Sequence, residues 1–160
     1  MTDIRTHYLD TSVIVKLLVD EDGSTAVRAY LGGHAVNFTT SLCFAETLGV
    51  LKAKHVHNRI SQEQYLAASE EIMARLRDQT LNIEDIALTE RAVFEEVESL
   101  AQKHTLDLAD AYQLLTIRTS FLSNLSGDSR PILVTADRRL AVAARSEGLR
   151  AWDCMHEPPP

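Results

Sequence analysis

Short β-prone segments alternate with longer helical patterns along almost the whole chain of 160 residues. The β-prone segments are apolar and rich in β-branched residues, and they lie near Thr6–Leu9, Val36–Thr39, Leu81–Ile83, Ile132–Thr135 and Leu149–Trp152. Strands separated by helix-length segments are typical of βαβ units, in which a helix crosses over between two parallel strands. The alternation therefore predicts an α/β fold with a largely parallel sheet.

The intervening segments carry helical periodicity and helix start and stop signals. We expect helices over residues 12–19, 24–31, 41 to about 57, 61 onward, 89–104, about 106–121 and about 137–146. The fourth opens with Ser61 and Gln64 as a capping box, and Tyr65, Ile72, Met73 and Leu76 are expected on its inner side. Gly148 is expected to stop the last helix, and residues 123–130 to form a polar surface loop.

The length is that of one domain, which can bury roughly 70% of its unfolded surface. We expect a single domain over residues 1–157 and a mobile tail over residues 158–160, because three consecutive prolines cannot join a helix or sheet. The formal charge of −7 and the pI near 5.3 argue against a protein that coats nucleic acid. They do not exclude a nucleic-acid enzyme that concentrates its acidic residues in a metal site.

The cysteines and the hydropathy indicate a cytoplasmic protein. Cys43 and Cys154 are far apart and form no CxxC pair, which predicts neither a disulfide framework nor a zinc site. The first apolar run, Val13 to Val15, is broken by Lys16, so no signal peptide is expected. No uncharged stretch is apolar enough for a membrane span.

Four carboxylates lie in mostly apolar segments: Asp10, Glu46, Asp110 and Asp137. A buried carboxylate is costly unless a cation or several hydrogen-bond donors compensate it. Asp10 ends the first predicted strand and Asp137 follows the fourth, so both are expected at the carboxyl edge of the sheet, where open α/β folds bind ligands. If the fold brings all four together, they would repel one another unless a divalent metal lay among them.

The other two acids are expected to reach the same edge from helices. With Ser41 as N-cap, Glu46 lies roughly 7 Å along its helix, and side chains lean toward the helix N-terminus. The residues around Glu46 are apolar on two helix faces, so we do not expect Glu46 to be simply solvated. With Asp107 as N-cap, Asp110 is the third residue of its helix, where a shorter side chain suffices.

Each of these residues also has a purely structural alternative. Asp10 could form a turn with Ser12, and Asp110 and Asp137 could be ordinary acids at helix starts. Asp107 is a cap first and a possible ligand second, while Ser12 and Thr135 could orient carboxylates or cap the backbone. Possible phosphate contacts, alternatively solvated surface groups, are Lys52, Lys54, Arg59 and Arg138.

Four segments carry a family resemblance, and they occur in the order YLDTSVIVKLL, SLCFAETLGVL followed by RISQEQY, LADAYQLL and ILVTADRRL. Together they resemble the PIN-domain ribonucleases, in particular the VapC-type toxins of prokaryotic toxin–antitoxin pairs. The resemblance implies a three-layer fold with five parallel strands in the order 3-2-1-4-5, and a nuclease that uses Mg²⁺ or Mn²⁺. It also implies an RNA substrate and a homodimer inhibited by a small antitoxin protein.

By position, the resemblance assigns Asp10, Glu46, Asp110 and Asp137 to the acidic quartet of the family, with Ser12 and Thr135 as its hydroxyl neighbours. The sequence departs from the family pattern at two places. Asp107 stands where many relatives have Ser or another cap, and the loop from Leu122 to Arg130 looks long.

The chemistry that these residues predict is hydrolysis of an RNA phosphodiester by metal-activated water. Asp10, Asp110 and Asp137 are expected as direct or water-mediated ligands, and Glu46 is expected to help bind the metal or position the water. Three alternatives stay open. A haloacid-dehalogenase-like phosphatase would need a second Asp where Ser12 stands, a receiver domain would need an adjacent acidic pair, and a catalytically silent PIN-like module would only bind RNA or a partner.

Overall fold

A computed structural model of the chain describes residues 5–32 and 35–160, and it shows one five-stranded sheet in the order β3-β2-β1-β4-β5. All neighbouring strands pair in parallel. The strands are β1 (Arg5–Leu9), β2 (Ala35–Thr39), β3 (Asn82–Ile83), β4 (Ile132–Thr135) and β5 (Arg150–Asp153). The predicted fold class, strand positions and strand order are therefore confirmed.

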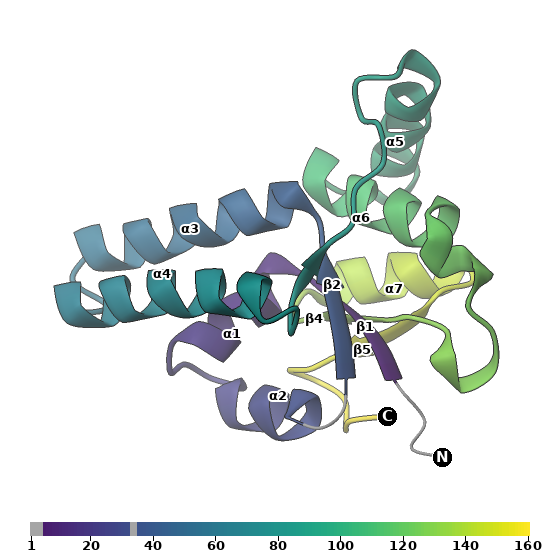
Figure 1. Cartoon of the computed structure of the whole chain (residues 1–160). Helices are drawn as coiled ribbons and strands as arrows, with labels where there is room; N and C mark the ends of the chain where they lie inside the picture. The colour runs from purple at the N-terminus through teal and green to yellow at the C-terminus, as the bar shows by residue number, and fades with distance from the viewer. Residues whose placement is uncertain (1–4, 33–34) are drawn as a thin grey trace.

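Seven helices connect these strands in the described part of the chain (Figure 1). They are α1 (Thr11–Leu18), α2 (Ser24–Leu31), α3 (Ser41–Val56), α4 (Gln62–Arg77), α5 (Arg91–His104), α6 (Leu108–Thr119) and α7 (Arg138–Ser146). Residues 123–130 are not only a polar loop, because Phe121–Asn124 and Gly127–Ser129 form two short 3-10 turns. Leu122 at the start of this segment is fully buried and anchors it to the core.

The sheet lies between two helical layers because successive strand residues point to opposite faces. On one face, Leu9, Val134 and Trp152 pack with residues of α1, α2, α3 and α4. On the other face, Tyr8 and Leu133 pack with residues of α5, α6 and α7. In Figure 1, α3 and α4 lie side by side and extend away from the sheet.

The start of α4 is the predicted capping box. The Ser61 hydroxyl accepts a hydrogen bond from the Gln64 backbone N–H at 3.1 Å, and the Gln64 side chain accepts one from Ser61 N–H at 2.8 Å. Ile72 is buried as expected, but Met73 is 45% exposed. The prediction for Met73 was wrong because one residue of rotation on a helix turns the side chain by about 100°.

The carboxyl edge of the sheet positions the candidate site. Leu9 pairs with Val134 in register, and the Asp10 backbone N–H donates to Val134 O at 3.1 Å. The end of β1 and the end of β4 are therefore adjacent. The helix that follows β2 is capped by Thr40 rather than by Ser41, since the Thr40 hydroxyl accepts from Cys43 N–H at 3.0 Å.

Two sequence expectations outside the site can also be compared with the structure. Cys43 and Cys154 are both buried free thiols, as expected for residues without a disulfide partner. Among the described residues, no helix has the length and apolar character that a bilayer span requires.

Candidate active site

Asp10 is the most buried of the four predicted acids, with 6% of its surface exposed. Its Oδ2 accepts hydrogen bonds from Ser12 Oγ at 2.6 Å and from Thr135 Oγ1 at 2.9 Å. Its Oδ1 accepts one from Gln113 Nε2 at 2.9 Å. Neutral donors therefore hold the Asp10 carboxylate in one orientation at the end of β1.

Ser12 and Thr135 both support Asp10 and the backbone beside it. Ser12 Oγ accepts from the Ala136 backbone N–H at 3.0 Å, and Thr135 Oγ1 accepts from the Asp137 backbone N–H at 2.9 Å. Each hydroxyl thus both orients the Asp10 carboxylate and accepts a hydrogen bond from the backbone, so the two predicted roles occur together. The loop that carries Asp137 is fixed relative to Asp10 by both contacts.

Glu46 is exposed, so the expectation that it could not simply be solvated was wrong. The neighbouring Ala45 and Gly49 are small and exposed, and they leave the carboxylate uncovered. Because the cap is Thr40, one residue before the expected Ser41, Glu46 lies about 9 Å from the cap along the helix axis. Its Oε2 nevertheless accepts a hydrogen bond from Thr11 Oγ1 at 3.0 Å, which directs it toward the end of β1.

Asp110 is half-buried on the first turn of α6, and Asp107 is the N-cap of that helix as expected. Asp107 Oδ1 accepts from the Asp110 backbone N–H at 2.8 Å. Burial, and after it the negative charges of Asp10, Asp107, Asp137 and Glu46, together raise the pKa of Asp110 to about 7. The shift shows that the acids are close enough to repel one another.

Asp137 is an exposed N-cap. Its Oδ1 accepts from the backbone N–H groups of Arg139 at 2.7 Å and Leu140 at 3.4 Å, which satisfies two donors at the start of α7. Asp137 therefore does cap a helix, which was the structural alternative to a role in metal binding. Asp137 also lines the cleft described next, so capping does not remove it from the site.

A cleft of about 380 Å³ gathers these groups at the carboxyl edge of the sheet. It is lined by Asp10, Thr11, Ser12, Val15, Glu21, Glu46, Val50, Lys54, Asp107, Asp110 and Asp137. All four predicted acids share this cleft although they come from four separate segments of the chain. Another cavity, of about 240 Å³, is lined by residues at the start of β4 and β5 and contains none of the predicted residues.

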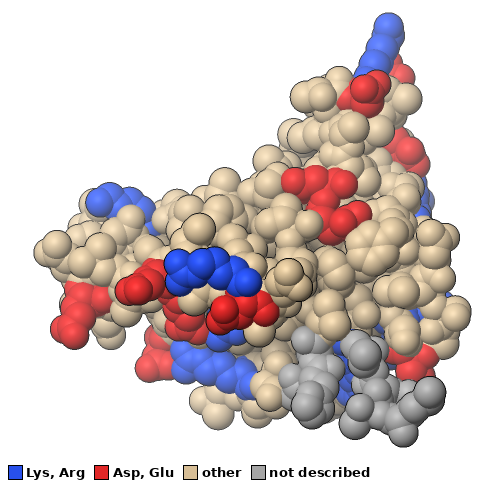
Figure 2. Space-filling view, in the orientation of Figure 1, with Lys and Arg blue, Asp and Glu red and all other residues tan. Residues whose placement is uncertain are grey.

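Only one of the four predicted phosphate contacts lines the cleft, and that residue is Lys54. Lys52 lies over the ring of Tyr65, with Nζ 5.3 Å from the ring centroid. Arg59 lies in a hollow beyond α3, and Arg138 lies in another hollow beside α7. On the face in view in Figure 2, basic and acidic side chains alternate, and no continuous basic surface forms there.

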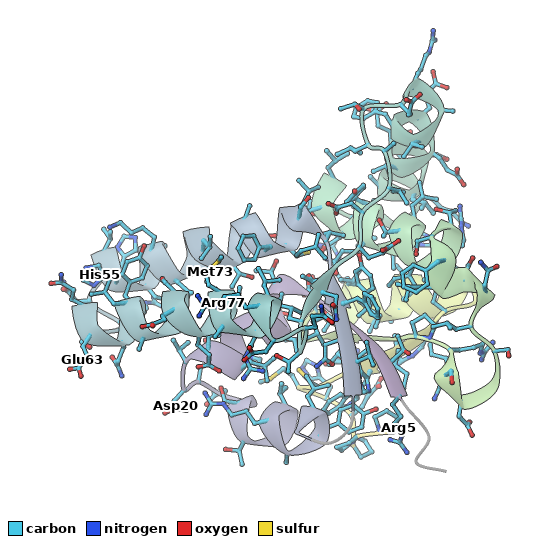
Figure 3. All side chains as sticks on the ribbon, viewed as in Figure 1. Arg5, Asp20, His55, Glu63, Met73 and Arg77 are labelled. Carbon is cyan, nitrogen blue, oxygen red and sulfur yellow. The ribbon has the colours of Figure 1, made fainter. Side chains whose placement is uncertain are left out.

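The described residues that line the cleft include no histidine. His55 stacks on Tyr65 with ring centroids 5.4 Å apart, and Figure 3 places it at the end of the α3–α4 pair that is farthest from the sheet. His104 and His156 pair with carboxylates outside the lining of the cleft, Glu147 and Asp153.

Gln113 is the main site residue that the sequence interpretation missed. It is fully buried, and its Nε2 donates to Asp10 Oδ1 and, at 3.5 Å, to Asp110 Oδ1. A signal was present, because Gln113 is a polar residue in an apolar run and lies three residues after Asp110, on the same face of the helix. Thr11 and Glu21 were missed as well, and the sequence around them gives no comparable signal.

The donor set fits a hard divalent cation. Carboxylate oxygens are the ligands that Mg²⁺ prefers, and burial together with the neighbouring acids raises the pKa of Asp110, a penalty on its charged form that a cation would relieve. In residues 5–32 and 35–160, no three His, Cys, Asp or Glu side chains converge closely enough to hold one ion. Mutual repulsion favours such a separated arrangement, and the exposed Glu46 and Asp137 have room to rotate.

The sheet order and the acidic cleft define an α/β domain that carries a cluster of carboxylates at the carboxyl edge of a parallel sheet. Residues 7–146 match the PIN domain family, and the chain belongs to that family. PIN domains are usually nucleases that act on RNA, and they generally bind divalent metals. Membership excludes the haloacid dehalogenase and receiver-domain alternatives.

The fold is similar to a solved structure. The crystal structure of PAE2754 from Pyrobaculum aerophilum matches with a TM-score of 0.56 and 21% sequence identity, over 92% of this chain and 90% of that chain. At this identity the likeness bears on the fold alone. No curated protein matches the sequence.

Proposed function

We propose that this PIN domain is a divalent-metal-dependent endoribonuclease and the toxin of a type II toxin–antitoxin pair. The observation that carries the nuclease proposal is the acidic cleft, which Asp10, Glu46, Asp110 and Asp137 all line and in which burial and the neighbouring acids raise the pKa of Asp110 to about 7. Such a cluster is expensive without a cation, and perturbed carboxylates in a cleft are typical of functional sites.

In this proposal Asp10, Asp110 and Asp137 hold Mg²⁺ or Mn²⁺ directly or through water, and Glu46 helps bind the metal or positions the attacking water. The metal, when bound, supplies water activation and neutralises charge on the phosphate. Ser12, Thr135 and Gln113 fix the orientation of Asp10, so this carboxylate needs little rearrangement to act. Asp110 exchanges its proton near neutral pH, so metal binding there competes with protonation.

The toxin role rests on the order of the four motifs that resemble VapC-type toxins. It includes a cytoplasmic homodimer and a small cognate antitoxin as partner. A short reading frame directly upstream of the gene, encoding a small protein that co-purifies with this chain and suppresses its activity, would support this role. A monomer in light scattering, or a gene without such a neighbour, would leave a free-standing ribonuclease.

The nuclease proposal is tested by incubating purified protein with total RNA and structured RNA in Mg²⁺, Mn²⁺ or EDTA. We expect cleavage with either metal, none in EDTA, and a loss of activity by a factor of about 10³ or more in Asp10→Asn. Because Asp10 is buried, the exposed Asp137→Asn serves as a second variant whose folding can be confirmed by circular dichroism. Metal-independent cleavage, or full activity in both variants, would refute the mechanism.

One observation favours a second candidate, a PIN-like module that binds RNA or a partner without cutting it. Within residues 5–32 and 35–160, no three acidic side chains converge closely enough to hold one ion. This candidate predicts RNA binding that persists in EDTA and no cleavage product under any metal condition. The cleavage assay and a binding assay on the same preparation therefore separate the two.

A further inference from the structure

Glu21 joins two lysines at the edge of the acidic cleft. It lies in the turn between α1 and α2, where its Oε1 accepts from Lys16 Nζ at 2.8 Å and its Oε2 accepts from Lys54 Nζ at 2.7 Å. The side chains are 25% exposed for Glu21, 9% for Lys16 and 22% for Lys54. Each carboxylate oxygen therefore serves a different ammonium group, and the three residues form one ion-pair triad.

The triad keeps a net positive charge. Partial burial acts to raise the pKa of Glu21, but the hydrogen bonds and charges of Lys16 and Lys54 outweigh it, so the pKa lies below its ordinary value. Glu21 is therefore ionised at neutral pH, and two cations with one anion leave a charge of +1. Lys16 is buried on α1, whereas Glu21 and Lys54 line the cleft, so Lys54 is the cation of the triad that borders it.

Among the described residues that line the cleft, Lys54 is the only one with a cationic side chain. The other charged lining residues, Glu21 excepted, are Asp10, Glu46, Asp107, Asp110 and Asp137. A phosphate that enters this cleft is repelled by those acids, and an ammonium in the lining offsets part of that repulsion.

The geometry also leaves Lys54 able to bind a phosphate. A lysine ammonium has three N–H donors, and the bond to Glu21 uses one of them. A free lysine would lose considerable side-chain entropy when it binds a phosphate, because its stem has four rotatable carbons. The bond to Glu21 fixes this stem before the substrate arrives, so less entropy is lost on binding.

We propose that Glu21 is a positioning residue that holds Lys54 at the cleft, where the Lys54 ammonium contacts a backbone phosphate of single-stranded RNA. Lys16 shares the charge of Glu21, so the Glu21–Lys54 pair is not neutral toward an anion. The inference rests on the proposed function, because it names how the RNA strand is held at the proposed nuclease site. The competing interpretation is that the triad only ties α1, α2 and α3 together.

The test measures RNA binding rather than cleavage, in the Asp10→Asn background and in EDTA. A fluorescent single-stranded oligoribonucleotide is titrated at several salt concentrations, with Glu21→Gln, Lys54→Gln and the double variant. We expect each single variant to weaken binding about fivefold. Each should also lower the salt slope by about 0.7, the value for one phosphate contact in a single strand. The double variant should bind no more weakly than Lys54→Gln alone.

The matched control is Glu71→Gln, which removes a partly exposed ion pair with Arg75 on α4, outside the lining of the cleft. It should leave RNA affinity and salt slope unchanged. The inference is overturned if Glu21→Gln lowers only the melting temperature, or if Glu21→Gln and Lys54→Gln add fully in the double variant. RNA binding that depends on the triad, in a protein that never cleaves RNA, would instead refute the nuclease proposal alone.

Discussion

The side-chain amide of Gln113 donates a hydrogen bond of 2.9 Å to Oδ1 of Asp10, across 103 residues of sequence. The same nitrogen lies 3.5 Å from Oδ1 of Asp110, so one neutral group bridges two carboxylates. The orientation of the amide follows from the chemistry, because an ionised carboxylate can only accept hydrogen bonds. Gln113 therefore links the start of α6 to the end of β1 at the candidate metal site.

Replacing Gln113 by methionine conserves volume and removes this bridge. We expect metal affinity or cleavage rate to fall by a factor of about 10 to 100, the usual effect of losing an outer-shell partner. The free energy of unfolding should fall by about 1 to 3 kcal/mol, because Asp10 Oδ1 loses its buried donor. Mn²⁺ titration, cleavage kinetics and urea unfolding measure these effects. Wild-type metal affinity and activity in Gln113→Met would contradict the role assigned to the bridge.

The raised pKa of Asp110 predicts a pH-dependent stability. Its folded-state pKa is about 7 against an ordinary value of 3.8, so the folded state binds this proton more tightly than the unfolded state. The free energy of unfolding should therefore fall as pH rises from about 4 to 7, relative to Asp110→Asn. In EDTA at pH 8, Asp110→Asn should be more stable than wild type by roughly 1 to 2 kcal/mol, allowing for solvent screening. A stability difference that is the same at pH 4 and pH 8 would contradict the assigned pKa.

Divalent metal should stabilise the folded protein by itself, without RNA. At a concentration of 100 times the dissociation constant, Mg²⁺ or Mn²⁺ should add about 2.7 kcal/mol to the free energy of unfolding. A rise in melting temperature on titration measures this effect. Asp110→Asn should reduce the rise, while Glu71→Gln should keep it. An unchanged melting temperature over millimolar Mn²⁺ would argue for the binding module without metal.

Glu147 is a structural ion-pair centre at the end of α7 and is not part of the lining of the cleft. Its carboxylate accepts from Lys103 and His104 at 2.6 Å and from Arg118 at 2.7 Å. Hydrogen bonds from Lys103 and His104 lower the pKa of Glu147 to about 2, against an ordinary value of 4.5. The ionised Glu147 carboxylate thus makes its full contribution to the free energy of unfolding above about pH 4.5, and this contribution is lost as pH falls toward 2.

Glu147→Gln should therefore lower the free energy of unfolding by about 1 to 3 kcal/mol at pH 7. The loss should shrink below pH 4.5, because the Glu147 carboxyl of the unfolded state then binds a proton that the folded state does not yet bind. The control is Glu95→Gln, whose partner Arg91 is 92% exposed and whose effect should be below about 0.5 kcal/mol. Urea unfolding at pH 7 and pH 3 provides the comparison. Equal losses at both pH values would show that the Glu147 charge is not the cause.

Several features could be predicted because they depend on residues close in sequence. The capping box of Ser61 and Gln64 and the cap formed by Asp107 are set by side chains that bond to backbone three residues away. The positions of Asp10 and Asp137 at the sheet edge follow from their place directly after a strand in a parallel α/β chain. These local rules explain why the strand positions and the helix starts were close to those observed.

The tertiary structure alone decided the surroundings of these residues. The apolar pattern around Glu46 indicated burial, but no neighbouring element covers Ala45 and Gly49, so the side chain is exposed. The bridge from Gln113 to Asp10 and the pairing of Lys54 with Glu21 join residues 103 and 33 positions apart. Sequence periodicity tells which face of an element a residue occupies. Which distant side chain contacts that face depends on how the elements pack. Here the packing brings four acids from separate segments, and Lys54, into the lining of one cleft.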